Sequence, residues 1–209
     1  MLELSFAVLA SLVTLVNPMG AVPVFLAMTP HHSKAERTHI ALQTSIYFVL
    51  ILLAFFFAGT LILSFFGISL NAMRIAGGLV ILSSGYSLLS GKFAEGRAIS
   101  KKVKAEALVK NDISFSPMAM PMLSGPGSIS YLIGIYSGHP AWPERLTVAA
   151  VVIVTGLIVY LILRSAPFLY KLLGESGLNA MTRIMGFLVM AIGIQYIITG
   201  IVDLVKVLA

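Results

Sequence analysis

The chain has 209 residues, of which 58% are hydrophobic and only 11% charged, and its mean hydropathy is +0.99. These values lie outside the range of soluble globular proteins and indicate an integral membrane protein, with room for about six helical spans of roughly 20 residues. The absence of cysteine excludes disulfides and thiolate metal sites, and the net charge of +6 comes from basic residues between apolar runs, which disfavours nucleic-acid binding.

The first apolar run, residues 4–28, is interrupted at Asn17-Pro18-Met19-Gly20. Proline removes a backbone donor and clashes with the preceding turn, and asparagine and glycine are poor helix formers, so we expect a helix to break here. At membrane depth, non-helical backbone is tolerated only where protein buries it or where it lines a cavity. The interruption is therefore a candidate binding site.

Two uninterrupted apolar runs follow, residues 40–66 and 73–89, with a polar loop at 29–37 before them and a turn at 67–71 between them. The second of these runs is rich in glycine, alanine and serine, which let helices approach closely in lipid. Residues 91–112 form a long polar segment. We interpret it as a basic cytoplasmic loop, either a solvated connector or an amphipathic helix on the membrane surface.

The second half of the chain repeats this plan. Its first apolar run, 113–136, contains a second break and is followed by a loop at 137–144, a span at 146–163, a connector at 164–179 and a last span at 184–208. The residues of the second break are Ser124, Gly125, Pro126, Gly127 and Ser128.

Several motifs recur at a spacing of 108 positions. Gly125-Pro126 lies 108 positions after Asn17-Pro18, and a second Glu-Arg pair, 144–145, lies 108 positions after the pair 36–37. The motif LNAMRI, which begins at position 70, recurs with one insertion as LNAMTRI from position 178. Such self-similarity predicts two related halves, 1–90 and 113–209, joined by the segment 91–112.

Three spans per half is an odd number, so consecutive halves must insert with opposite topology. The predicted fold class is therefore an all-α integral membrane protein with six transmembrane helices in two inverted three-helix repeats, the first helix of each repeat being broken. If the N-terminus is outside, eleven of the fourteen Lys and Arg residues lie on the inner side of the membrane. The positive-inside rule thus predicts that both termini are outside.

The two breaks are predicted to form one substrate site. In inverted-repeat carriers the site lies near the midplane, where half-helix N-termini direct the positive ends of their dipoles at an anionic group. We expect the freed backbone amides to bind a carboxylate, while carbonyls and the side chains of Asn17, Ser124 and Ser128 bind an ammonium group. The alternative is that both breaks are kinks used only for packing.

Further polar residues in or beside the spans are candidates for coupling or gating. Arg74 and Arg183 occupy matching positions in the two halves, and we expect them to snorkel to the interface, with gating or helix capping as the alternative. Thr44 and Gln195 are expected to form interhelical hydrogen bonds, with substrate contact as the alternative. Asp112 is expected to begin a helix, with an electrostatic role at that helix end as the alternative.

Titratable residues argue against catalysis and leave the coupling ion open. No Asp or Glu lies in the middle of a predicted span, so a buried carboxylate relay is not expected. Sodium held by backbone carbonyls, proton coupling through carboxylates at the span edges, and simple facilitated exchange all remain open. All four histidines fall in or beside loops and there is no embedded acid pair, so we expect neither an enzyme nor a metal site. No cofactor is predicted.

Several segments, in the same order, resemble the MarC family. They are NPMGAVPVFLAMTP at 17–30, RIAGG at 74–78, the segment from Asp112 through Pro117 and Pro121, GPGSI at 125–129 and RIMGFLVMAIGIQYI at 183–197, and the resemblance covers nearly the whole chain. It implies a multi-pass protein of the bacterial or archaeal inner membrane. It also implies a six-span transporter of small neutral amino acids such as glycine, alanine, serine or threonine.

We therefore predict an alternating-access carrier whose partners are a neutral amino acid and the lipid bilayer, with homo-oligomerisation left open. A channel would also use two broken helices meeting at the midplane, but it would lack saturable flux. Antibiotic efflux is suggested by the family name, whereas the Gly, Ser and Pro residues of the breaks favour a small solute over a bulky drug.

Overall fold

The computed structural model describes residues 1–91 and 113–208, and every regular element in these two ranges is a helix. The first range contains α1 (Leu2–Val16), α2 (Pro18–Met28), α3 (Lys34–Phe65) and α4 (Leu70–Leu89). The second contains η1 (Ser114–Leu123), α7 (Pro126–Gly138), α8 (Trp142–Arg164) and α9 (Ala166–Leu208). Most of the predicted basic loop, with Asp112, lies outside the described residues.

Five helical stretches of the described chain are long and apolar enough to cross a membrane. They are Leu2–Met28, Lys34–Phe65, Leu70–Leu89, Trp142–Arg164 and Ala166–Lys206. The remaining predicted span, 113–136, is divided between η1 and the 13-residue helix α7. The protein is thus an all-helical, multi-pass integral membrane protein.

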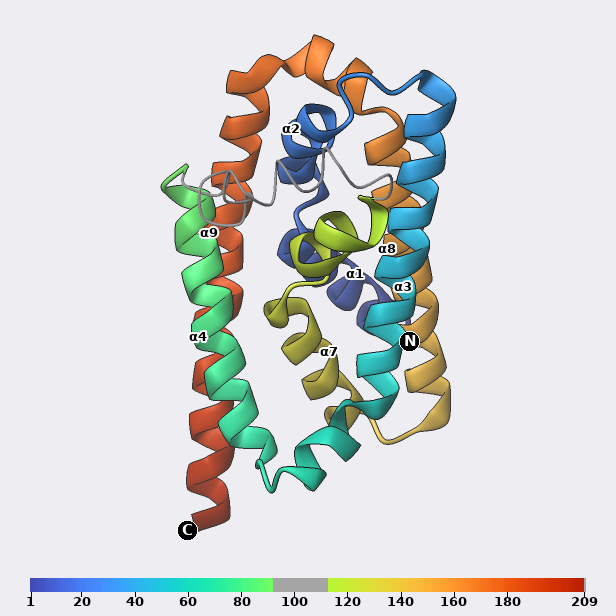
Figure 1. Cartoon of the computed structure of the whole chain (residues 1–209). Helices are drawn as coiled ribbons and strands as arrows, with labels where there is room; N and C mark the ends of the chain where they lie inside the picture. The colour runs from blue at the N-terminus through green and yellow to red at the C-terminus, as the bar shows by residue number, and fades with distance from the viewer. Residues whose placement is uncertain (92–112, 209) are drawn as a thin grey trace.

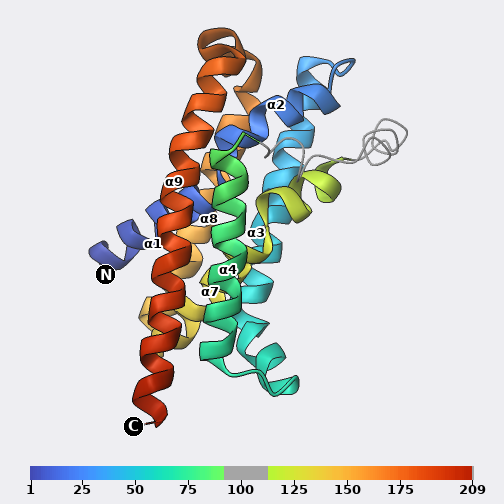
Figure 2. The same cartoon turned by 90° about the vertical axis from the view of Figure 1, so that its left-hand side faces the viewer.

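The helices form a bundle with two long pairs at its sides (Figure 1). α3 and α8 lie together along one side and α4 and α9 along the other, with α1, α2, η1 and α7 between them. α2 runs from the middle of the bundle to one end, and α7 runs from the middle to the opposite end. The view at right angles shows the same opposed directions of α2 and α7 (Figure 2).

Apolar side chains occupy both the interior and the outer surface. Phe25, Phe48 and Phe56 are fully buried between the helices, whereas Leu61 and Phe65 of α3 are 72% and 84% exposed. An exterior that carries so many large apolar side chains is unfavourable in water and favourable in lipid. The burial pattern therefore agrees with the span assignment.

Two predicted loops are partly helical, and the sequence prediction was wrong there. α3 begins at Lys34 because Ser33 Oγ accepts the Glu36 amide at 3.3 Å, while Glu36 Oε2 accepts the Ser33 amide at 2.7 Å. These two bonds satisfy amides that a helix start otherwise leaves unpaired. The connector 164–179 is also helical, interrupted by the turn at Ser165 and by Gly174 (φ 64), and its buried Leu178 packs against the core.

The first half of the second broken span is less regular than predicted. Ser116 and Met120 have extended backbone angles, and each directly precedes a proline, which disfavours the helical conformation of the residue before it. Hydrogen bonds in η1 instead span five residues, as from the Ser124 amide to the Ala119 carbonyl at 2.8 Å. The two prolines within 116–121 were the sequence signal for this irregular helix. Our prediction of the break considered only the pair Gly125-Pro126.

α4 and α9 pack with their backbones in contact. A Cβ atom added to Gly193 would lie 2.7 Å from the Leu82 amide nitrogen, and one added to Gly85 would lie 2.8 Å from the Gly186 carbonyl oxygen. Glycines on both helices are therefore required for this approach. The expected role of small residues in α4 is confirmed, and we call this contact the glycine seam.

Candidate functional site

The first break is formed by a single left-handed residue between α1 and α2. Asn17 has φ 46 and ψ 63, a conformation that asparagine tolerates better than most residues, and Pro18 follows at the first position of α2, where a missing amide donor costs nothing. The Asn17 Oδ1 atom accepts the Gly20 amide at 3.4 Å. The predicted break is therefore confirmed, and Asn17 caps the half-helix that follows it.

The second break also places a proline at the start of a half-helix, but its N-cap is extended (φ −75, ψ 164) and not left-handed. Gly125 is the N-cap of α7 and Pro126 occupies its first position. Ser128 Oγ donates to the Gly125 carbonyl at 2.9 Å, so its hydrogen is already used. Both breaks thus start a new half-helix, and in the first break the Gly20 amide is already bonded to Asn17.

Contacts between the halves bring the two breaks into the same region of the bundle. α1 touches α7 and α2 touches η1, so each piece of one broken span packs against a piece of the other. α3 packs against both η1 and α7, and Ser114 Oγ of η1 donates to Gln43 Oε1 of α3 at 3.2 Å. The start of η1 is therefore held against α3 at Gln43, the residue before Thr44.

Four buried side-chain atoms of the described residues have no hydrogen-bond partner in the protein, and three of them belong to predicted site or coupling residues. These three are Asn17 Nδ2, Ser124 Oγ and Thr44 Oγ1, and the fourth is His32 Nδ1. Asn17, Ser124 and Thr44 are 2%, 1% and 0% exposed. Because an unpaired buried polar group costs about 1–3 kcal/mol, such atoms are rare without a functional reason.

The orientation of the Asn17 amide changes its expected role. Its oxygen is occupied by the Gly20 amide, and the atom left free is the donor Nδ2. A free donor suits a carboxylate, whereas we expected this side chain to bind an ammonium group. The hydroxyls of Ser124 and Thr44 can both donate and accept.

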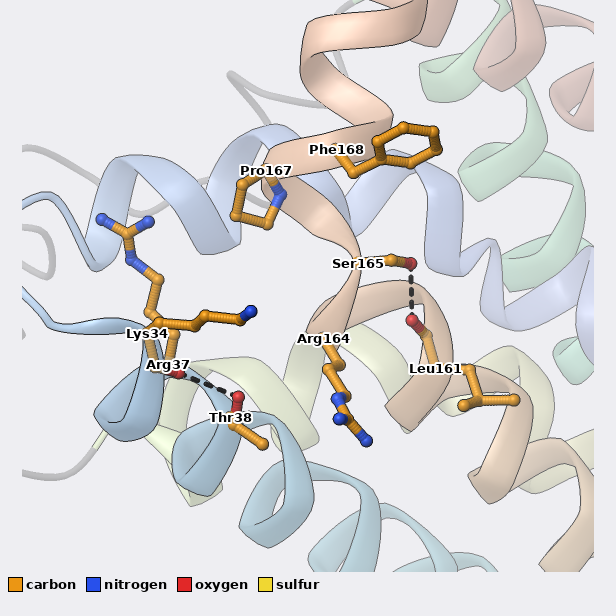
Figure 3. Close-up of a pocket in the computed structure, with 8 residues that line it drawn as sticks. All are labelled: Lys34, Arg37, Thr38, Leu161, Arg164, Ser165, Pro167 and Phe168. Carbon is orange, nitrogen blue, oxygen red and sulfur yellow. Dashed lines mark hydrogen bonds between the residues drawn. The ribbon is translucent and has the colours of Figure 1, made fainter.

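The other predicted break residues are described by their burial and by the helices they pack against. Gly20 is buried, Met19 is half-buried, and a Cβ atom on Gly127 would lie 2.9 Å from Ile81 Cγ1 of α4. Gly127 therefore allows α7 to approach α4. None of the break residues lines the pocket at the end of the bundle where α3 begins (Figure 3).

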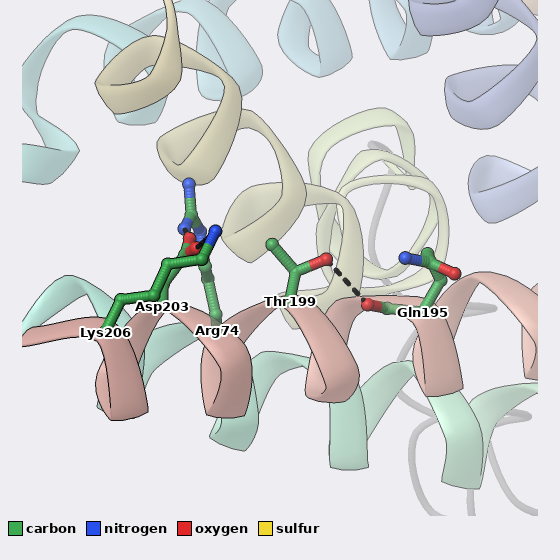
Figure 4. Close-up of polar contacts among 5 residues, drawn as sticks. All are labelled: Arg74, Gln195, Thr199, Asp203 and Lys206. Atoms are coloured by element: carbon green, nitrogen blue, oxygen red, sulfur yellow. Dashed lines mark hydrogen bonds and ion pairs between the residues drawn. The ribbon is translucent and has the colours of Figure 1, made fainter. Parts of the chain in front are cut away.

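Arg74 is paired rather than snorkelling. Its Nη1 donates to Asp203 Oδ2 across the α4–α9 contact, and Lys206 Nζ lies 4.0 Å from Asp203 Oδ1 (Figure 4). The Arg74 side chain is only 12% exposed. The sequence did not reveal this pair because the two residues are 129 positions apart.

Arg183 and Gln195 are exposed residues of α9. The backbone carbonyl of Gln195 accepts a hydrogen bond from Thr199 Oγ1 at 2.9 Å (Figure 4). Arg183 lies beside Gly91, where a Cβ atom would be 3.2 Å from Arg183 Nη2. The expected interhelical hydrogen bond of the Gln195 side chain is not found.

Two arginines that sequence analysis used only as repeat markers close the ends of the half-helices. Arg37 Nε donates to the carbonyl of Thr29, the C-cap of α2, at 3.0 Å, and Arg145 Nε donates to the carbonyl of His139, the C-cap of α7, at 3.0 Å. A cation is favourable at a helix C-terminus. The repeat spacing of 108 was the signal that could have suggested a shared role.

Within the described residues, no three His, Cys, Asp or Glu side chains lie close enough together to hold a metal ion. Titratable groups are also missing from the two breaks themselves. The chemistry available there is hydrogen bonding by amides, hydroxyls and helix ends. That chemistry suits reversible binding of a small polar molecule.

Known proteins place the chain in a family. The profile described as "MarC family integral membrane protein" matches residues 2–205. The UPF0056 membrane protein YhcE of Escherichia coli strain K12 is 36% identical over 196 residues, which cover 94% of this chain and 91% of that protein. A UPF0056 membrane protein of Methanocaldococcus jannaschii is 37% identical over 203 residues, covering 96% of this chain and 98% of that one.

A third relative carries the family name. The UPF0056 inner membrane protein MarC of Citrobacter koseri is 32% identical over 207 residues, which cover 95% of this chain and 94% of that protein. No solved protein structure shows a significant match. The chain belongs to the MarC family of integral membrane proteins.

Proposed function

We propose that this protein is a secondary transporter of small neutral amino acids, of the glycine, alanine, serine and threonine class, and not an enzyme. The observation that carries the proposal is the set of three buried, unpaired polar atoms on Asn17, Ser124 and Thr44. They belong to the two breaks and to the helix that packs against the second broken span. A zwitterionic ligand would supply partners for all three.

The proposed architecture is six spans in two inverted repeats, 1–90 and 113–209, with the basic loop 91–112 between them. Repeat-related residues with equivalent contacts support it. Arg37 and Arg145 donate to C-cap carbonyls of the second half-helices. A Cβ atom on Gly91 would approach Arg183, and one on Gly200 would approach Cβ of Arg74. Opposed directions of α2 and α7 in Figure 1 are those of an inverted pair.

In the proposed binding mode, the substrate carboxylate lies at the N-termini of α2 and α7 and accepts a hydrogen bond from Asn17 Nδ2. The hydroxyl oxygens of Ser124 and Thr44, together with carbonyls of the breaks, accept from the ammonium group. Close packing of α7 limits the substrate to a small side chain. A Cβ atom on Gly134 would clash with the Tyr196 hydroxyl, and one on Gly127 would meet Ile81.

Alternating access is the proposed mechanism because the unpaired side chains of Asn17, Ser124 and Thr44 are almost inaccessible in this conformation. A substrate can reach them only if the surrounding helices move. The energy source in the proposal is a proton or sodium gradient, without a further cofactor. Arg74, Arg183, Gln195 and Asp112 remain candidates for gating or coupling, and the Arg74–Asp203 pair joins α4 of the first half to α9 of the second.

The proposed location is the bacterial or archaeal cytoplasmic membrane with both termini outside. The excess of Lys and Arg in the loops at one side supports this orientation. The proposed partners are the amino acid, the bilayer and, as an option, further copies of the chain.

Uptake into proteoliposomes tests the proposal. We would measure labelled glycine, alanine and threonine with an imposed proton gradient, with a sodium gradient and with no gradient. Saturable uptake that unlabelled substrate competes away is expected, and the gradient that drives it identifies the ion. Non-saturable flux would indicate a channel. If folded, reconstituted protein moves none of these amino acids, the substrate class is wrong.

A further inference from the structure

A basic pocket of about 730 Å³ opens at the end of the bundle where α3 begins and α8 passes into α9 (Figure 3). Three cationic side chains line it, Lys34 and Arg37 from α3 and Arg164 from α8. None of the described residues that line the pocket is acidic. The pocket therefore carries uncompensated positive charge and favours an anion.

Two of the three cationic side chains, Lys34 and Arg164, have donors available for a ligand. Lys34 is exposed and its side chain extends from α3 toward α8 and α9 (Figure 3). Arg164 is exposed and uses Nη1 on the Tyr160 hydroxyl at 3.2 Å, which leaves its other donors available. Arg37 is committed to the carbonyls of Thr29 and Pro30, so it contributes charge more than hydrogen bonds.

An apolar groove of about 310 Å³ continues from this pocket between α3 and α8. Leu42 of the groove is one helical turn beyond Thr38 of the pocket, and Leu157 is one turn from Leu161. Tyr160 joins the two, because it lines the groove and bonds Arg164. From Leu42 to Leu50 the groove follows α3 for about 12 Å into the span.

The charged pocket belongs to one end of the bundle only. At the repeat spacing of 108, the position of Lys34 corresponds to Trp142 and that of Arg164 to Phe56. Arg37 alone has a cationic counterpart, Arg145, and both arginines cap half-helices. Helix capping therefore explains the shared arginine, whereas Lys34 and Arg164 need another explanation.

We propose that the pocket and groove bind one anionic phospholipid, with its phosphate between Lys34 and Arg164 and one acyl chain in the groove between α3 and α8. A basic pocket between transmembrane helices at the positive side of a membrane is the arrangement that recognises anionic headgroups. The groove distinguishes a lipid from a free phosphate, which would occupy only the pocket. This inference does not depend on which solute the protein transports.

Lipid titration of the full-length protein in detergent, followed by native mass spectrometry, tests the charge. We expect phosphatidylglycerol to bind more tightly than phosphatidylcholine with the same chains. Lys34→Ala and Arg164→Ala should each weaken phosphatidylglycerol binding about fivefold, and the double variant about thirtyfold. Lys171→Ala is the matched control, since it removes an exposed lysine that lines neither pocket nor groove, and it should bind as the wild type does.

A second pair of variants tests the groove. Ile46→Trp fills it and should weaken phosphatidylglycerol binding, whereas Leu61→Trp, on the same helix and 72% exposed outside the groove, should not. Melting temperatures would confirm that each variant is folded, and Lys34→Arg should retain binding where Lys34→Ala is unstable.

Three results would overturn the proposal. They are equal affinity for the two lipids, wild-type affinity in the double variant, and displacement of the lipid by millimolar inorganic phosphate together with no effect of Ile46→Trp. The last result would show that the pocket takes a free anion.

Discussion

Replacing Asn17 by glycine separates its role in binding from its role in folding. Asn17 holds a left-handed conformation with φ 46, which glycine adopts without strain, and glycine is only a few tenths of a kcal/mol worse as an N-cap. The variant therefore keeps the break but removes the unpaired Nδ2 donor. A lost hydrogen bond to a charged carboxylate costs about 1.5–3 kcal/mol, so we expect substrate affinity to fall about 10- to 150-fold.

Asn17→Ala provides the comparison. It removes the same donor, but alanine in the left-handed region costs about 1–2 kcal/mol, and loss of the cap adds about 1 kcal/mol. Both variants should lose the same affinity, while only Asn17→Ala should lose substantial stability. Calorimetric titration with the amino acid that saturates uptake gives the first quantity, and thermal unfolding in detergent gives the second. Wild-type affinity in Asn17→Gly would refute the binding role, as would an affinity loss that follows stability alone.

Three further predictions concern the helix contacts that support the site. Gly193→Ala should destabilise the protein by about 1–3 kcal/mol in detergent unfolding, because its Cβ would meet backbone atoms of α4. Gly138→Ala is the control and should not destabilise the protein, because its Cβ would have no atom within 4 Å. In a double-mutant cycle, Arg74→Ala and Asp203→Ala should show a coupling energy of about 1–3 kcal/mol, and additive effects would mean that the ion pair contributes nothing. Arg145→Ala should cost about 1 kcal/mol through loss of its carbonyl bond at the end of α7, and increased hydrogen exchange limited to that helix end would locate the effect.

Local chemistry allowed the breaks to be predicted from the sequence. Pro18 and Pro126 lack an amide donor, and each follows a poor helix former, Asn17 or Gly125, so a new half-helix was expected to start at each. The candidate substrate site was predicted at the same two breaks. Sequence could not show which atoms remain unpaired, because the free donor of Asn17 depends on the Gly20 amide occupying the oxygen of its side chain.

The features that sequence analysis missed depend on contacts between distant segments. In the sequence, Asp203 is an ordinary polar residue near the end of a span. Only the packing of α9 against α4 places it beside Arg74. Residues after Arg164 seemed too polar for a span, with Lys171 and Glu175 among them, yet they are helical because Leu178 is buried against other helices. Tertiary packing overrides composition in such amphipathic segments.

The glycine seam limits how the two halves can move. α4 and α9 approach so closely that backbone atoms of one helix contact those of the other, and a shift along this contact would bring side chains against backbone. By contrast, α1 touches α7 and α2 touches η1 over short stretches, and it is there that the unpaired atoms of Asn17 and Ser124 lie. Opening is therefore expected to separate the pieces of the broken spans while the glycine seam acts as the axis. In the proposed alternating-access cycle, a bundle that is rigid at the glycine seam and joined by short contacts at its broken spans would expose the same buried atoms first to one end and then to the other.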